Sequence, residues 1–236
     1  ERFADAGNFT FVFVGNFDVP TLRPLLETYL GSLPSTNSNE TFRDLGIRAP
    51  QGQVSKTVRR GADPKASVQL VYMGDFEWVP EQATQVDALA EVLEIKLVEQ
   101  LREAESGVYG VSASGVYGRY PVPRYTFRIN FGCAPENVEK LIALVNKEIA
   151  RLKTTGADAA DIAKFRAETQ REQELQRKDN NFWLGYLSNQ YYNGDDPLEL
   201  LSETEFLKQV TPQSTKAAAN RYLGNNLLRF VLLPKE

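Results

Sequence analysis

A long helix with a continuous apolar stripe most constrains the fold of this chain. In residues 80–105, PEQATQVDALAEVLEIKLVEQLREAE, apolar residues recur at steps of three and four. The stripe comprises Val86, Leu89, Ala90, Leu93, Leu97 and Leu101. Such a stripe covers one side of a helix, and that side must pack against a core. The sequence therefore predicts a helix that lies over a second apolar layer.

Alternating apolar and polar residues predict the strands of that second layer. Residues 65–76 place Val68, Leu70 and Tyr72 on one face. Residues 123–134 place Tyr125, Phe127, Ile129 and Phe131 on one face, and Arg124, Thr126, Arg128 and Asn130 on the other. Further strands are expected at residues 8–17, 53–61, 107–118 and 225–236.

The remaining apolar patterns have helical spacing. They predict helices at residues 18–34, with Asp18 as N-cap, and at 135–156, 157–194, 196–211 and 211–224. Groups of strands separated by groups of helices favour an α+β fold, in which helices cover one face of a sheet. The sequence shows no linker, so residues 1–236 are expected to form a single domain.

Composition excludes several classes of function. The chain has no histidine, so it cannot form a histidine-ligated zinc site or a Ser-His-Asp triad by itself. Its formal net charge is -4 with both signs mixed, which argues against a nucleic-acid partner. No apolar run is long enough to span a membrane. We also expect no metal site, and expect Cys133 to be a small buried apolar residue.

The stretch LREAESGVYGVSA, residues 101–113, joins the long helix to the next strand. Arg102 falls at the helix end, where a cation interacts favourably with the helix dipole. Tyr109 opens the strand, where a half-buried aromatic residue is ordinary. The glycine at 107 allows a sharp turn, which would bring both side chains to the same rim as two hydrogen-bond donors. Such donors suit a peptide carbonyl or a developing oxyanion.

This stretch resembles the segment of pitrilysin/insulinase zinc metallopeptidases in which a helix ends in Leu-Arg and a Gly-x-Tyr strand start follows. Further ordered segments are similar to the family: FTFVFVGNFDVPTLRPLLETYLGSLP, FGCAPENVEKLIALVNKEIARLKTTGADAADIAKFRAE and NNFWLGYLSNQYYNGDDP. The resemblance implies an α/β roll with a mostly antiparallel sheet covered on one face by helices. It also implies that the chain is the last, non-zinc-binding domain of a larger multi-domain peptidase.

The resemblance further implies a division of labour in the full-length enzyme. Zinc and a general-base Glu lie on a preceding domain, and Arg102 and Tyr109 reach the substrate carbonyl at the zinc. Peptide substrates and the preceding domains of the same polypeptide are then the partners, and the periplasm or cell envelope is the expected location. The isolated domain is expected to be inactive and to bind no cofactor.

Three interpretations remain open. The full-length protein is either a zinc metalloendopeptidase or a catalytically inactive interaction or scaffold protein, as some members of this family are. An unrelated α+β binding domain is the third interpretation. The sequence of the first domain distinguishes the first two, because only an enzyme needs an intact His-x-x-Glu-His motif there.

Overall fold

The computed structural model describes residues 4–36, 40–104, 108 and 110–235. The side chains of residues 101–104 are not part of that description. The contacts divide the chain into two compact units, residues 1–43 with 169–203 and residues 44–168 with 204–236. The prediction of a single domain over residues 1–236 stays a prediction.

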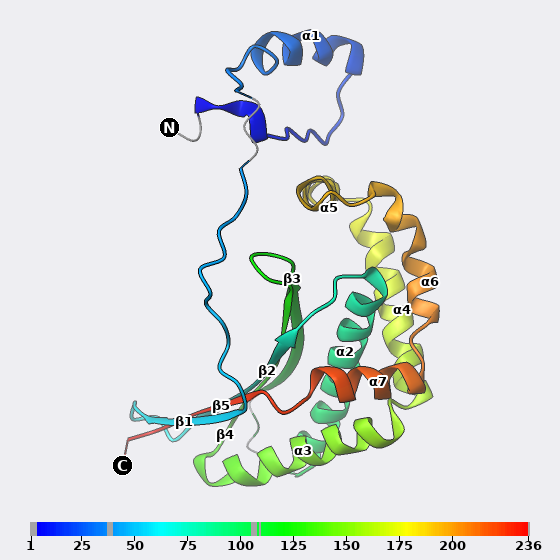
Figure 1. Ribbon diagram of the computed structural model, residues 1–236. Coiled ribbons are helices and arrows are strands. Elements are labelled where there is room, and N and C mark those ends of the chain that lie inside the picture. Colours follow the sequence, from blue (N-terminus) through cyan, green and yellow to red (C-terminus); the bar gives the residue numbers. More distant parts are fainter. Residues whose placement is uncertain (1–3, 37–39, 105–107, 109, 236) are drawn as a thin grey trace. The chain divides into compact units, whose positions relative to one another are not determined.

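The larger unit is built on one five-stranded sheet (Figure 1). Its strands are β1 (Gln53–Arg59), β2 (Ala66–Asp75), β3 (Gly110–Gly118), β4 (Arg124–Cys133) and β5 (Leu227–Leu233). The order across the sheet is β1-β5-β2-β4-β3, so the last strand of the chain is inserted between the first two. All pairs are antiparallel except β1 with β5, which is parallel.

Helices cover one face of this sheet (Figure 1). They are α2 (Pro80–Ala104), α3 (Val138–Thr155) and α7 (Pro212–Tyr222). The first part of α4 (Ala159–Gln176) and all but the first residue of α6 (Glu203–Lys208) belong to the same unit. The fold is therefore α+β with a mostly antiparallel sheet covered on one face, which confirms the predicted fold class. The predicted stripe of α2 is buried from Val86 to Leu97.

The predicted strand faces are confirmed by the burial of alternate residues. Phe127 and Ile129 are completely buried under the helices, and so is Cys133, whose thiol pKa is raised by burial. Val68, Leu70 and Tyr72 lie in the same core. The intervening residues of β4 stay partly or wholly exposed on the opposite face, here called the open face.

An ionic network joins three helices of the larger unit. Glu148 of α3 is buried, and its carboxylate accepts hydrogen bonds from Arg151 at 2.7 and 2.9 Å and from Gln100 of α2 at 2.8 Å. Arg151 also donates to Asp158 at 3.2 Å, just before α4. Lys96 of α2 lies 3.2 Å from Asp161 of α4. These bonds hold α2 in register with α3 and α4.

The Glu148→Ala variant is expected to lose about 1.5–3 kcal/mol of unfolding free energy, because Arg151 and Gln100 each lose a hydrogen-bond partner in a buried setting. Urea denaturation followed by circular dichroism measures this. Glu174→Ala, at an exposed position of α4, is the control and is expected to change stability little. Equal stability of both variants and the wild type would contradict a stabilising network.

The smaller unit holds α1 (Val19–Tyr29), the last part of α4, α5 (Asn180–Asn193) and two 3-10 helices, η2 (Ala6–Asn8) and η4 (Pro197–Ser202). Asp18 caps α1 as predicted and accepts from the Thr21 N–H at 2.9 Å. The predicted strand at 8–17 is wrong, because the described residues there contain no strand. A strand needs a hydrogen-bonded neighbour, and the alternation of Phe9, Phe11 and Phe13 supplies none.

The predicted long helix at 157–194 is two helices. The helix α4 ends at Gln176, and α5 begins at Asn180 after Asp179, whose side chain accepts from the Asn181 N–H at 2.8 Å. In α5, Phe182, Trp183 and Tyr186 pack ring against ring, with centroids 5.4–6.5 Å apart. Tyr191 and Tyr192, near the end of the same helix, are 58% and 74% exposed.

Candidate functional site

The predicted site residues lie where α2 ends and β3 begins. Arg102 falls in the last turn of α2, which the structure follows to Ala104, but its side chain is not described. Tyr109 lies outside the described residues, directly before Gly110, the first residue of β3. The meeting of the two side chains therefore stays a prediction, whereas the sheet beside them is fully described.

The strand register aligns side chains in rows across the open face. Gln69 of β2 pairs with Asn130 of β4, Asn130 pairs with Ser112 of β3, and Gln69 also pairs with Phe230 of β5. Directly opposed residues on the same face of a sheet have their Cβ atoms about 5 Å apart, so these side chains are neighbours. The result is a row that runs from an aromatic ring through two amides to a hydroxyl.

The next row towards Tyr109 has almost no side chains in its middle. There Ser67 of β2 pairs with Leu232 of β5 and with Gly132 of β4, which in turn pairs with Gly110 of β3. Because Gly132 and Gly110 occupy neighbouring positions in this row, no side chain covers the sheet there, whereas the neighbouring positions carry side chains. This area is here called the glycine floor.

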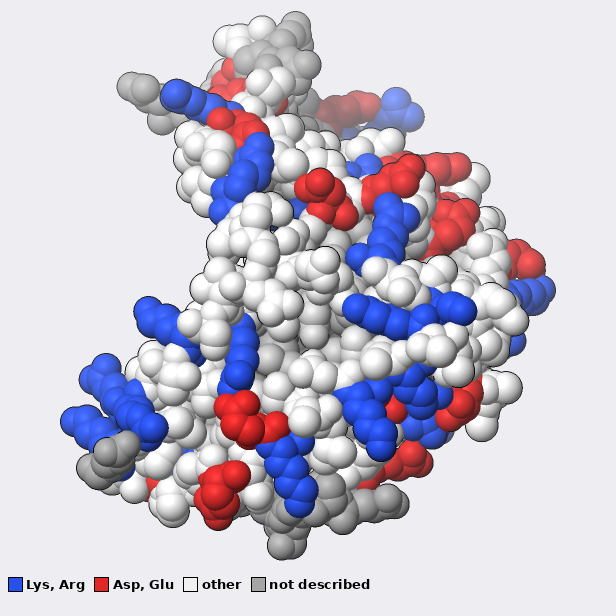
Figure 2. All heavy atoms as spheres, turned by 60° about the horizontal axis from the view of Figure 1, so that its bottom comes forward, with Lys and Arg blue, Asp and Glu red and all other residues white. Residues whose placement is uncertain are grey.

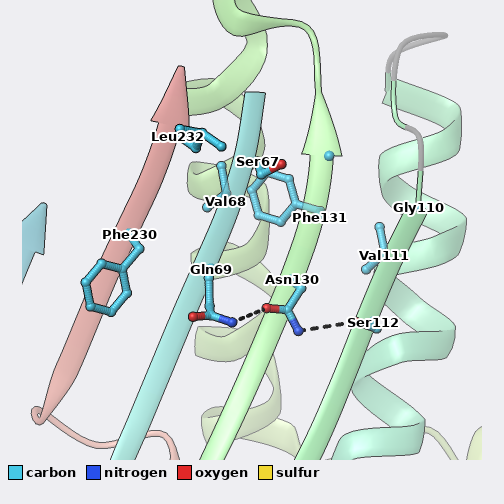
Figure 3. A pocket seen from close by; sticks show the side chains of 11 residues that line it. Ser67, Val68, Gln69, Gly110, Val111, Ser112, Asn130, Phe131, Phe230 and Leu232 are labelled. Carbon is cyan, nitrogen blue, oxygen red and sulfur yellow. Dashed lines mark hydrogen bonds between the residues drawn. The ribbon is translucent and has the colours of Figure 1, made fainter. Parts of the chain in front are cut away.

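The glycine floor is the bottom of a hollow of about 560 Å³, here called the open-face hollow (Figure 3). Phe230 and Leu232 rise on the β5 side, and Gln69 and Asn130 rise from the central strands (Figure 3). Phe230 is 37% exposed and Leu232 is 43% exposed, so both keep apolar surface free for a ligand. The described residues that line this hollow carry no charged side chain.

A chain of hydrogen bonds fixes the polar wall of the open-face hollow (Figure 3). The Gln69 side-chain amide donates to Asn130 Oδ1 at 2.9 Å, and the Asn130 amide donates to Ser112 Oγ at 3.4 Å. Each amide is therefore held in one orientation. Gln69 Oε1, which lies on the Phe230 side in Figure 3, remains an acceptor, and the Ser112 hydroxyl keeps its own proton to donate.

A second hollow of about 540 Å³ lies at the other end of the same strands. Met73, Asp75 and Thr126 line it together with the segment at residues 47–51. Tyr125 also lines it, and burial raises the pKa of this phenol to about 12, so it stays protonated at neutral pH. Its hydroxyl donates a hydrogen bond to the Arg221 carbonyl oxygen at 3.5 Å.

The charge pattern argues against a polyanion site. Figure 2 shows Lys and Arg side chains mixed with Asp and Glu side chains over the face in view, separated by uncharged surface. Among the described residues there is no group of three or more His, Cys, Asp or Glu that could hold a metal ion, and no helix is long and apolar enough to cross a membrane. The described residues that line the open-face hollow are uncharged.

Sequence reasoning missed the open-face hollow. Alternation had placed Asn130 on the face opposite the core, but nothing in the sequence aligns it with Gln69 and Ser112. The signal that was present is the pair of glycines, Gly110 and Gly132, at strand positions facing away from the core. A glycine inside a strand marks a place where another chain or a ligand approaches closely.

The family description that matches this chain is Peptidase M16 inactive domain, and it covers residues 1–200. The chain belongs to the M16 peptidase family. The resemblance to the pitrilysin/insulinase metallopeptidases is thereby confirmed, and the word inactive applies to the domain type that this chain represents.

Two curated relatives are zinc proteases by name. A zinc protease PQQL-like of Arabidopsis thaliana is 30% identical over 94% of this chain and 25% of its own length. The probable zinc protease PqqL of Escherichia coli is 27% identical over 100% of this chain and 26% of its own length. The chain thus spans about a quarter of the relatives it matches.

A solved structure shows the same fold. The crystal structure of the periplasmic protease PqqL from Escherichia coli superposes with a TM-score of 0.79, at 24% identity, over 94% of this chain and 25% of that one. The M16 inactive domain from Pseudomonas fluorescens superposes with a TM-score of 0.77, at 18% identity, over 99% of this chain and 55% of that one.

Proposed function

We propose that this chain is the substrate-enclosing C-terminal domain of a zinc-dependent metalloendopeptidase that cleaves peptides. The observation that carries the proposal is the M16 inactive-domain match over residues 1–200, together with relatives named as zinc proteases that are about four times as long as the match. Zinc is then held by another domain of the full-length protein, and this chain contributes contacts to the substrate. The name of the PqqL structure supports a periplasmic location.

In this proposal Arg102 and Tyr109 are the catalytic residues of the chain. Zinc bound by the other domain would supply the activated water for attack on the peptide carbonyl. The Arg102 guanidinium and the Tyr109 hydroxyl donate to the carbonyl oxygen as it gains negative charge, which lowers the energy of the transition state. The places of the two residues in the chain support this role, because Arg102 lies in the last turn of α2 and Tyr109 directly precedes the first residue of β3.

A peptidase assay of the full-length protein tests the proposal. Peptide cleavage is expected with zinc, none is expected after treatment with a chelator, and readdition of zinc restores it. Residues 1–236 alone are expected to cleave nothing, since histidine is absent from the chain. If the zinc-loaded full-length protein leaves a broad peptide mixture intact, the proposal that it is a peptidase is wrong.

The alternative is a catalytically inactive interaction or scaffold domain of a peptidase-like protein. The description of the matched domain as inactive is the observation that favours it. In that case the sheet and its open face serve to bind a partner, and Arg102 is only a charge at a helix end. The two proposals differ in the chelator experiment, since only the enzyme requires zinc for turnover.

A further inference from the structure

We propose that the open-face hollow is a specificity site that seats an uncharged, apolar segment of an extended substrate peptide. This inference rests on the proposed peptide-binding function and assigns a substrate class to it. Two features of the described residues carry it: the glycine floor, and the uncharged walls of two different kinds. The place of Gly110 directly after Tyr109 in the sequence links the hollow to the proposed catalytic residue.

The floor explains why a peptide backbone fits. Gly132 and Gly110 face each other across β4 and β3, and Ser67 stands beside Gly132 on β2. Without side chains at these two strand positions, an incoming backbone approaches the sheet more closely than it does over any longer side chain. A volume of about 560 Å³ is enough for a few residues of an extended chain.

The polar wall explains how such a backbone is held. A peptide unit carries one N–H donor and one C=O acceptor. The wall offers the complementary pair, because Gln69 Oε1 accepts and the Ser112 hydroxyl donates, and the Asn130 amide between them is fixed by both neighbours. Polar groups that are already oriented need little further ordering when a ligand binds.

The apolar wall explains the preference among side chains. Phe230 and Leu232 expose 37% and 43% of their surface on the open face. An aliphatic or aromatic substrate side chain would cover this surface, and burial of apolar surface is favourable. A Lys, Asp or Glu side chain at the same place would lose hydration without an oppositely charged partner among the residues that line the hollow. In the row of the strand register that holds Phe230 and Gln69, the nearest cation is Lys56 of β1, which lies beyond Phe230.

The position explains why the hollow affects cleavage. Gly110 lines the hollow and directly follows Tyr109 in the sequence. Consecutive Cα atoms are about 3.8 Å apart, so a peptide held over Gly110 lies within a few residues of the bond that Tyr109 is proposed to contact. The hollow thus selects a residue close to the scissile bond on one side.

The test uses binding and cleavage by the full-length protein. The probes are fluorescein-labelled peptides of one sequence with a single position changed to Leu, Glu or Lys, and that position is moved along the peptide. Binding is measured by fluorescence anisotropy on chelator-treated protein, and cleavage is measured on zinc-loaded protein. For one register of the varied position, we expect the Leu peptide to bind and to be cleaved about ten-fold better than the charged peptides.

Three variants test whether the open-face hollow, and not the rest of the open face, sets the preference. Ser67→Leu fills the hollow and is expected to remove the ten-fold preference for Leu. Ser114→Leu adds the same side chain to an exposed serine of β3 that lines neither hollow, and it is expected to keep the preference. Gln69→Lys places a cation in the wall and is expected to shift the preference to Glu at that position.

Each outcome bears on the inference separately from the peptidase proposal. If Ser67→Leu loses the preference for the Leu peptide and Ser114→Leu keeps it, the open-face hollow is the specificity site, whether or not the protein cleaves peptides. If cleavage is chelator-sensitive and all variants show the same preference, the peptidase proposal stands and the proposal that the hollow is a specificity site is wrong. Without cleavage, the anisotropy measurement decides alone, and peptides that bind equally to wild type and to Ser67→Leu overturn the hollow.

Discussion

Replacing Arg102 by alanine in the full-length protein is expected to slow peptide cleavage about a hundred-fold. Loss of one donor to a developing oxyanion costs about 3 kcal/mol, which corresponds to this factor. Because the interaction is made in the transition state, kcat falls while KM changes little. Tyr109→Phe removes a single hydroxyl group and is expected to act in the same direction. Steady-state kinetics with one fluorogenic peptide measures both variants.

Several controls separate catalysis from a structural role of Arg102. Arg171→Ala removes an exposed arginine from α4 and is expected to keep wild-type turnover. Arg102→Lys keeps the charge but not the planar guanidinium, so a partial recovery is expected if geometry matters. Wild-type turnover in both Arg102→Ala and Tyr109→Phe would overturn the assignment. A stability loss of about 0.3–1 kcal/mol would then identify Arg102 as a helix-end charge.

The second large effect is expected at Gly156, where α3 ends. Gly156 has φ +78°, and a Cβ placed there would lie 1.9 Å from the Pro212 carbonyl oxygen at the start of α7. The backbone conformation alone costs a non-glycine residue about 1–3 kcal/mol, and the clash adds to this. Gly156→Ala is therefore expected to lower the unfolding free energy by about 3 kcal/mol. In a domain of this size the melting temperature falls by roughly 6–12 °C.

The neighbouring contacts show why this loss would spread. The Ala157 N–H donates to Thr215 Oγ1 of α7 at 2.9 Å, next to the point where Gly156 meets Pro212. Moving α7 away to relieve the clash would break this buried bond. The control is Gly118→Ala in β3, where a Cβ would meet no atom within 4 Å. Equal melting temperatures for the two variants would contradict the close approach of α3 to α7.

Much of the larger unit was predictable because its patterns are local. The stripe of α2 and the alternation in β2 and β4 each follow from the period of one element, and burial confirms both. The positions of Arg102 and Tyr109 at a helix end and before a strand also follow from period and glycine placement. Whether their side chains meet depends on the turn between them, which periodicity does not determine.

Residues 8–17 show where a local pattern is insufficient. Their alternation is as regular as that of β4, yet the described residues there form no strand. Regular alternation says which side chains would share a face, but a strand exists only when a second strand accepts its hydrogen bonds. Similarly, Asp179 divides a helical stretch by capping α5, which the continuous polar pattern around it concealed.

The sequence by itself determined that this chain contains no histidine-based chemistry, and which faces of its helices and strands are buried. Both properties reside in residue type and short spacing. Only the tertiary structure decided that β5 lies between β1 and β2, and that Phe230, Gln69, Asn130 and Ser112 form one row beside a glycine floor. The physical reason is that strand order and register are set by pairing between distant segments, and a shift of one residue would have turned every one of these side chains to the opposite face.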